Sequence, residues 1–331
     1  MDIQKYLEDL IYDKSDYKLS NEDKKTILHE GIAQFIFNKL NSSKFRAQAT
    51  EASYSQSIKN KIQLCINHNL PIHLTLPFGA TKNPYLPTAP GIDWAEVCSM
   101  AYLRQYLAPI AKAYKHGVIL HYISVSIFEE KVNRIPQKDV NTYDNQFAKL
   151  VKFYSKLLPK SLKITFTRVA DDFSQKEINY QLTIKINELR KNWLKQDSKT
   201  REYKLLRAKR NVVIKLNDKN VEDIILNAVW GHDAFCSECW TAEVAPWDKK
   251  DMITLGHNYT NGWAIHVRST PGSSVNFWSG IGILEKRGDT FLPTVLSPLQ
   301  FVSQKQNIKN VSVKLFDKLS PNLKTIPVLK K

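Results

Sequence analysis

The stretch that decides the fold runs from Ile72 to Gly91 and reads IHLTLPFGATKNPYLPTAPG. Its first part, residues 72–76, is apolar and is followed by Pro77, which predicts a short buried strand. Residues 78–91 contain three prolines and two glycines, a composition that excludes both helix and strand. Because long loops within compact domains are uncommon and often functional, we expect this loop to bind a ligand.

The chain after this loop alternates between helices and strands. We predict helices over residues 93–114, with a kink or break at Pro109, and over residues 136–158. Strands are predicted over residues 118–126 and 162–169. This alternation predicts a Rossmann-like α/β fold, with a mainly parallel sheet flanked by helices. In such sheets, ligands bind beyond the carboxyl ends of the strands.

The two ends of the chain differ from this middle part. Residues 1–70 are predicted to form a helical N-terminal region, in which Ser20 and Asp23 indicate a capping box. Residues 71–331 form the Rossmann-like part, and we expect both parts to make one compact unit. Residues 174–230 again read as helical. A β-rich C-terminal extension follows, with strands predicted over residues 262–268, 279–285 and 291–296. We expect it to be antiparallel and to join the sheet edge, and we expect the lysine-rich last thirty residues to form a loose tail.

Composition limits the class of protein. Of the 331 residues, 43% are hydrophobic, which is enough for a sizeable core. The sequence contains no run of about 18 apolar residues, and its first residues lack the pattern of a signal peptide. With four cysteines in a chain of this length, reduced thiols are the default. We therefore expect a cytoplasmic protein with no membrane partner.

The net charge of +16 attracts anions, from phosphorylated metabolites to nucleic acids. Residues 185–215 hold eleven Lys or Arg against three Asp or Glu, together with Trp193 and Tyr203, which can stack on bases. A basic RNA-binding surface is therefore one alternative. We favour a solvated helix, because the charges recur around it and include acidic partners.

Cys236 and Cys239 form a single CxxC pair. A structural zinc site needs two further ligands, and only His232 and the distant His257 are available. A second CxxC or an HxxxH pattern is missing, so we predict two ordinary thiols and no metal site.

The loop after the first predicted strand contains several polar residues that can bind a ligand. Gly79, Thr81, Lys82 and Asn83 combine a turn that exposes backbone N–H groups with a cationic side chain, a set that can hold a phosphate or carboxylate. The alternative is a solvated lysine. The GxxxxGK[ST] pattern of a P-loop is absent.

Two carboxylates follow at the start of the next helix. Asp93 and Glu96 are three residues apart and share one face. We interpret them first as a helix cap, with substrate amine binding or proton transfer as the alternative.

Other candidates lie at the carboxyl ends of later strands. Ser124 and Ser126 follow the second strand, and Arg168 ends the third, so we expect them to meet the Lys82 loop in one crevice. His266 and Arg268 alternate along a strand that precedes a run of hydroxyl residues, which indicates a possible phosphate cradle.

Several of these motifs, in this order and spacing, resemble the isocyanide (isonitrile) synthase family, the pyoverdine and dityrosine biosynthesis group. The matching residues are Pro77-Phe78-Gly79, Lys82-Asn83-Pro84, Asp93, Glu96, Tyr114, Gly117, Asp139, Val140, Tyr143 and Trp278-Ser279-Gly280. The chain departs from the family at Ser124-Val125-Ser126, where the family has Ser-Asp-Gly, and at Ser279, where it has His.

The resemblance implies a Rossmann-like enzyme without nicotinamide, metal or other cofactor. It implies conversion of an amino acid's amine to an isocyanide, with ribulose 5-phosphate supplying the carbon and an iron/2-oxoglutarate oxygenase acting next. Lys82 would then meet the sugar phosphate or its carbonyl, while Glu96 and Asp93 would handle the amine or the proton transfers. The remaining alternatives are the RNA-binding protein and an inactive member of the family that serves as an interaction scaffold.

Overall fold

The computed structural model describes residues 2–12, 17–50, 52–237, 251–256, 264–316 and 318–330. The α-helices are α1 (Ile3–Tyr12), α2 (Asn21–Leu40), α3 (Ala52–Asn67), α4 (Trp94–Ala113), α5 (Glu129–Asn133), α6 (Gln137–Ser155), α7 (Val169–Asp172), α8 (Gln175–Asn192), α9 (Ser198–Lys209), α10 (Val221–Ser237) and α11 (Pro298–Gln304). The strands are β1 (Ile72–Phe78), β2 (Val118–Ser124), β3 (Leu162–Arg168), β4 (Met252–Gly256), β5 (Ile265–His266), β6 (Ile281–Arg287), β7 (Thr290–Leu296), β8 (Ile308–Ser312) and β9 (Thr325–Leu329). Among the described residues, no helix has the length and apolarity that crossing a bilayer requires.

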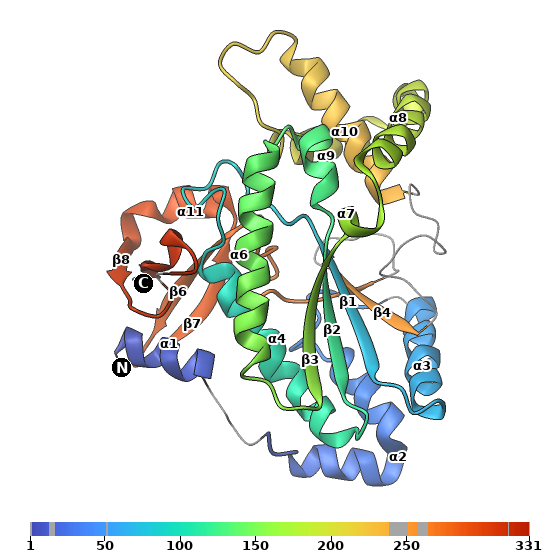
Figure 1. Ribbon diagram of the computed structural model, residues 1–331, viewed down its shortest axis with the longest axis vertical. Coiled ribbons are helices and arrows are strands. Elements are labelled where there is room, and N and C mark those ends of the chain that lie inside the picture. The colour runs from blue at the N-terminus through green and yellow to red at the C-terminus, as the bar shows by residue number, and fades with distance from the viewer. Residues whose placement is uncertain are drawn as a thin grey trace.

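The parallel sheet predicted from the sequence is confirmed. Its strands lie in the order β3-β2-β1-β4-β5, and every described pair is parallel (Figure 1). The first strand is longer than expected, because β1 continues through Pro77 to Phe78. Pro77 is tolerated there because the β1–β4 pairing ends at Thr75, so the missing N–H faces no described neighbour on that side.

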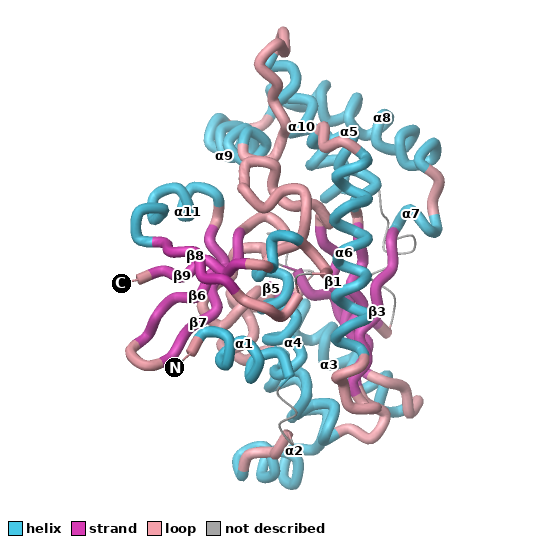
Figure 2. The backbone as a smooth tube through the Cα atoms, turned by 60° about the vertical axis from the view of Figure 1, so that its left-hand side comes forward, coloured by secondary structure: helices cyan, strands magenta, loops and turns pink. Residues whose placement is uncertain are grey.

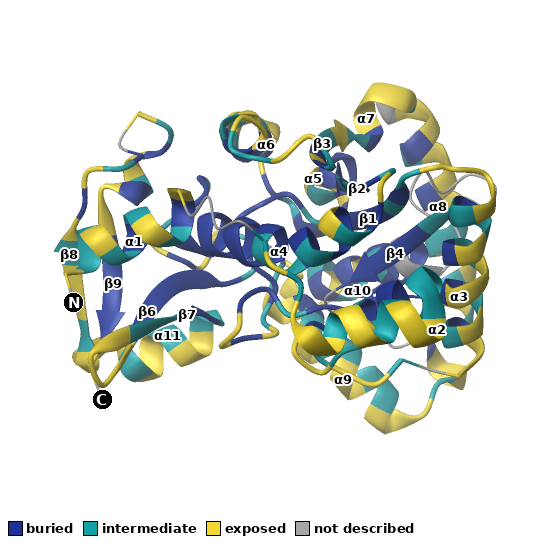
Figure 3. Cartoon of the chain, turned by 90° about the horizontal axis from the view of Figure 1, so that it is seen from below, coloured by how far each residue is buried: buried dark blue, intermediate teal, exposed yellow. Residues whose placement is uncertain are grey.

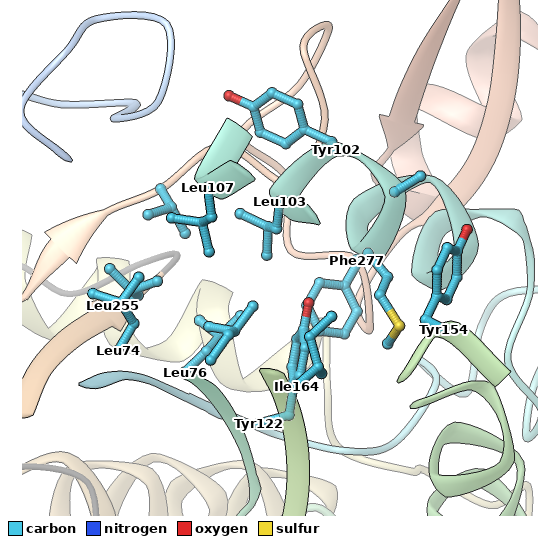
Figure 4. Packing of buried hydrophobic residues seen from close by; sticks show 14 of the residues in the cluster. Leu74, Leu76, Tyr102, Leu103, Leu107, Tyr122, Tyr154, Ile164, Leu255 and Phe277 are labelled. Carbon is cyan, nitrogen blue, oxygen red and sulfur yellow. The ribbon is translucent and has the colours of Figure 1, made fainter. Parts of the chain in front are cut away.

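Helix α4 lies at the centre of the molecule, between the parallel sheet and a second sheet (Figure 3). Fifteen of the twenty residues of α4 are buried, which is typical of a helix covered on most sides. In Figure 4, Leu103 and Leu107 of this helix lie over Leu74 and Leu76 of β1. The predicted break at Pro109 is wrong, since α4 continues through it as one helix.

The C-terminal strands form a sheet of their own, with the order β7-β6-β9-β8 (Figure 2). The expectation that the C-terminal extension joins the edge of the first sheet is therefore wrong for β6 to β9. It is right for β5, which comes from the strand predicted over residues 262–268 and lies at the edge of the parallel sheet. A hairpin turn at Gly288 joins the antiparallel strands β6 and β7, but β6 and β9 run parallel, so this sheet is mixed and not purely antiparallel as expected. The expected loose tail is also wrong, because Leu323 and Ile326 are fully buried in the main core and β9 completes the sheet.

The helices α8, α9 and α10 form a separate layer above the carboxyl ends of the parallel strands (Figure 1). They have hydrophobic clusters of their own, one of them around Trp193 and Trp230. The helices α1, α2 and α3 instead contribute to the main core, and the capping box of Ser20 and Asp23 is confirmed. The helical layer therefore roofs the edge of the sheet at which ligands bind in folds of this class.

Candidate functional site

A cavity of about 520 Å³ lies between the carboxyl ends of β1 and β2 and the roof of helices. It is lined from the sheet side by Phe78, Gly79, Thr81, Asn83, Pro84 and Val125, from the region of α5 by Phe128, Glu129, Val132, Asn133 and Ile135, from the roof by Tyr203, Leu206, Arg207, Arg210, Asn211 and His232, and from the C-terminal part by Ser274, Val275, Asn276, Trp278, Ser279, Ser297 and Pro298. Its size suits a small molecule, and its wall is mixed in polarity.

The roof brings two guanidinium groups and an imidazole to the cavity. Arg207 is committed to an ion pair, with Nη2 lying 3.0 Å from Asp233 Oδ1. Arg210 is exposed, and in the described part of the chain no carboxylate is paired with it. Burial and the nearby Arg207 lower the pKa of His232 to about 3, so this imidazole is neutral at pH 7. Arg210 is therefore the cationic group available to an anionic ligand.

Glu129, the first residue of α5, places a carboxyl group in the wall of the cavity. Asn133 Nδ2 donates a hydrogen bond of 2.7 Å to Glu129 Oε2. Burial raises the pKa of Glu129 to about 7, against the opposing effect of hydrogen bonds from Asn133 and Thr81. A carboxyl group with this pKa exists in both protonation states near neutral pH, as general acid–base chemistry requires.

Gly79 is required at the floor of the cavity because two side chains approach its backbone. A Cβ atom at this position would lie 2.9 Å from Trp278 Nε1 and 3.1 Å from Glu129 Oε1. The indole and the carboxyl group therefore flank the same point. The absence of a side chain at Gly79 lets the loop pass between them.

Lys82 does not line the cavity, so its expected contact with a bound anion stays a prediction. Its side chain is fully buried, and Nζ lies 2.7 Å from Glu96 Oε1 and 3.2 Å from Asp93 Oδ2. Nζ also donates to the backbone carbonyls of Phe277, at 3.0 Å, and Gly280, at 2.9 Å. These four acceptors use all the hydrogen-bonding capacity of the ammonium group. The two carbonyls among them flank Trp278, so Lys82 fixes both ends of the segment that carries it.

Asp93 and Glu96 cap α4, as the first interpretation predicted. Tyr143 joins this cluster from α6, with its hydroxyl donating to Glu96 Oε1 at 2.7 Å. Burial raises the pKa of Glu96 to about 7, although Lys82 acts in the opposite direction. We call Lys82, Asp93, Glu96 and Tyr143 the buried ion cluster.

The raised pKa of Glu96 predicts a pH dependence of stability. The folded state holds this proton more tightly than the unfolded chain, so the free energy of unfolding should fall as pH rises from about 4.5 to about 7. Glu96→Gln removes this titration, and we expect the variant to lack that part of the fall. Chemical denaturation of both proteins at several pH values measures the difference. An identical pH dependence in the two proteins would contradict the assignment.

Ser124 and Ser126 do not join the Lys82 loop in one crevice, which corrects that expectation. Both hydroxyls turn to Asp144 of α6 and donate hydrogen bonds of 2.9 Å to its carboxylate. Arg168 lies beside them, with Nε 3.7 Å from Asp144 Oδ2. The cause is the carboxylate of Asp144, which binds both hydroxyls and lies beside the guanidinium group of Arg168. Val125, between the two serines, lines the cavity instead.

His266 and Arg268 also lie away from the cavity. The residues of β5 and its extension pair with the segment after α2, where Arg268 Nε donates to the carbonyl of Ser43 at 3.3 Å. His266 is buried, and its carbonyl accepts from the N–H of Ala47. The expected phosphate cradle therefore does not form around them, and only Ser274 of the hydroxyl run reaches the cavity.

Of the predicted binding residues, Gly79, Thr81 and Asn83 line the cavity. Asn83 also ties the loop to the roof, since its Nδ2 donates to the carbonyl of Arg210 at 2.9 Å. Sequence reasoning missed Glu129 and Arg210 as site residues. The signal for Glu129 was its place just after the second strand, whereas Arg210 was hidden within a basic run read as a solvated helix.

The CxxC pair cannot be compared with the structure, because Cys239 and His257 lie outside the described residues, as does the side chain of Cys236. Within the described ranges, no group of three or more His, Cys, Asp or Glu side chains is placed to hold a metal ion. The charge of the basic run 185–215 is partly neutralised, since Lys204 and Arg207 both pair with Asp233 of α10.

No family model and no curated protein matches this chain. Among solved structures, it is similar to the crystal structure of the PvcA protein from Pseudomonas aeruginosa. The two share 15% sequence identity with a TM-score of 0.65, over 90% of this chain and 99% of that chain. The chain therefore has the fold of PvcA along nearly its whole length.

Proposed function

We propose that this chain is a biosynthetic enzyme of the isocyanide synthase type, which converts an amino acid's amine to an isocyanide with ribulose 5-phosphate as the carbon donor. The motif resemblance of residues 77–143 to the isocyanide synthase family and the fold shared with PvcA support this proposal. The observation that carries it is the cavity at the carboxyl ends of the parallel strands, where Arg210 offers a cation that no carboxylate of the described residues pairs with.

We assign different roles to the cavity residues and to the buried ion cluster. The cavity residues hold the ligands, with Arg210 facing the phosphate of the sugar and Asn83, Asn133 and Asn276 offering neutral hydrogen bonds. We assign the buried ion cluster a positioning role in this reaction, because it holds the carbonyls on either side of Trp278 and Ser279. The same groups would place the loop and the C-terminal segment at a fixed distance across the cavity.

The test is direct. The purified protein is incubated with single amino acids and ribulose 5-phosphate, and the products are read by mass spectrometry. We expect a new mass corresponding to the isocyanide of at least one amino acid, dependent on the phosphosugar. The absence of such a product for every amine would count against the proposal. If the protein instead binds an RNA probe, and its affinity falls steeply as the salt concentration rises, the RNA-binding alternative is favoured.

Arg210→Gln should weaken the binding of the phosphosugar without changing the fold. A charge-assisted hydrogen bond contributes about 1.5–3 kcal/mol, so we expect the KM for ribulose 5-phosphate to rise by about 10-fold or more. Steady-state kinetics at fixed ionic strength measures this. The matched control is Lys209→Gln, which removes one charge from the neighbouring exposed position and should stay within about twofold. Equal losses in both variants would show a general effect of charge and would remove Arg210 from the site.

A further inference from the structure

We propose that Glu129 is the proton-transferring catalytic residue of the cavity, with Asn133 and Thr81 as its positioning residues. This inference rests on the proposed function for its reaction and on the geometry of the cavity for its residue. The motif resemblance gives the proton transfers to Glu96 and Asp93 of the buried ion cluster. The present inference gives them to a side chain outside that cluster.

The position of Glu129 makes it suitable. Within the part of the chain that the structure describes, it is the only carboxylate lining the cavity. Oε2 accepts the hydrogen bond from Asn133, one turn along the same short helix, and Thr81 donates to the carboxyl group from the loop after β1. Oε1 lies at the floor beside Gly79, next to the indole of Trp278. Two elements therefore fix the orientation of the carboxyl group at the wall of the cavity.

The groups around Glu129 leave it free to titrate near neutral pH. Tyr203 and Arg207 face the cavity from α9, Arg210 faces it from the position directly after α9, and the neutral His232 faces it from α10. None of them forms a described ion pair with Glu129, and burial is the main reason that its pKa rises to about 7. On its own helix, Glu130 is exposed, and Lys131 Nζ turns outward to donate to the carbonyl of Asn179 at 2.9 Å. In the loop, Lys82 points into the buried ion cluster.

The step requires no further reactant. The Glu129 carboxylate takes a proton from an N–H or O–H group of the bound ligand, and the electron pair of that bond stays on the nitrogen or oxygen. The carboxyl group returns the proton at a later step to an atom that has gained negative charge. Such positioned proton transfer contributes typically about 10²–10⁴-fold to a rate.

The experiment compares Glu129→Gln and Glu129→Asp with the control Glu130→Gln, which changes the neighbouring exposed carboxylate. With amino acid and ribulose 5-phosphate, we expect Glu129→Gln to lower kcat by about 100-fold or more with little change in KM. The inflection of the pH–rate profile near pH 7 should disappear, and Glu129→Asp should recover part of the rate. A Glu129→Gln variant that keeps both the rate and the inflection overturns the inference while leaving the proposed function standing.

A second measurement needs no turnover. Trp278 lies beside the Glu129 carboxyl group, so protonation should quench its fluorescence and give an inflection near pH 7 in the wild-type protein. Glu129→Gln or Trp278→Phe should each remove that inflection, whereas Glu130→Gln should keep it. If the protein makes no isocyanide, the proposed function fails, and this titration still decides whether Glu129 exchanges a proton in the cavity. A wild-type profile without the inflection would overturn the inference.

Discussion

Lys82→Met should lower the free energy of unfolding by about 3–5 kcal/mol, the cost of removing one partner from a buried ion pair. The methionine fills similar space, so the loss is electrostatic. Glu96 and Asp93 would keep their places in a site that excludes water, without the ammonium group that lies 2.7 and 3.2 Å from them. The carbonyls of Phe277 and Gly280 would also lose their donor. Denaturant unfolding at pH 7.5 measures the change.

The controls separate this electrostatic loss from a loss of volume. The double variant with Lys82→Met and Glu96→Gln removes both charges, and we expect it to recover part of the stability, because the glutamine can still accept from Tyr143. Lys152→Met removes an exposed lysine from α6 and should stay within about 0.5 kcal/mol of the wild type. If the double variant is less stable than Lys82→Met alone, the unpaired charge of Glu96 is not the cause of the loss in stability.

The predicted part of the fold is the part that local sequence determines. The alternation of strands and helices between residues 72 and 168 predicted β1, β2, β3, α4 and α6 within a few residues, because buried strands and amphipathic helices have their own periods. The position of the loop with Lys82 at a strand end followed from the same pattern. The C-terminal tail was misjudged because its lysines were weighed above the apolar run of residues 326–329, which forms β9.

The direction of the Lys82 side chain could not follow from local sequence. Two of its acceptors, the carbonyls of Phe277 and Gly280, come from nearly two hundred residues later. Asp144 is a similar case, since from its position on α6 it binds the hydroxyls of Ser124 and Ser126 away from the cavity. Such choices depend on which elements the fold brings together, and periodicity carries no information about that.

The second large effect is expected at Gly282 in β6, where the two sheets meet through α4. A Cβ atom there would lie 2.0 Å from the backbone nitrogen of Ala95 and 2.2 Å from the carbonyl carbon of Trp94. Both obstacles are backbone, so neither can rotate away. Gly282→Ala must therefore push β6 off the first turn of α4, and the hydrogen bond from Gly282 N to Asp93 Oδ1 is lost with it.

We expect Gly282→Ala to cost about 3 kcal/mol or more in unfolding free energy, at the upper end for overpacking. The displacement should also reach the cavity, because the segment before β6 carries Trp278 and supplies the Gly280 carbonyl to Lys82. The control is Gly288→Ala at the hairpin turn, where φ is +59° and no atom lies within 4 Å of the new Cβ. That variant should lose only about 1 kcal/mol, the cost of a left-handed backbone without a clash. Equal losses in thermal and denaturant unfolding of the two variants would mean that β6 does not rest on α4 as closely as these distances require.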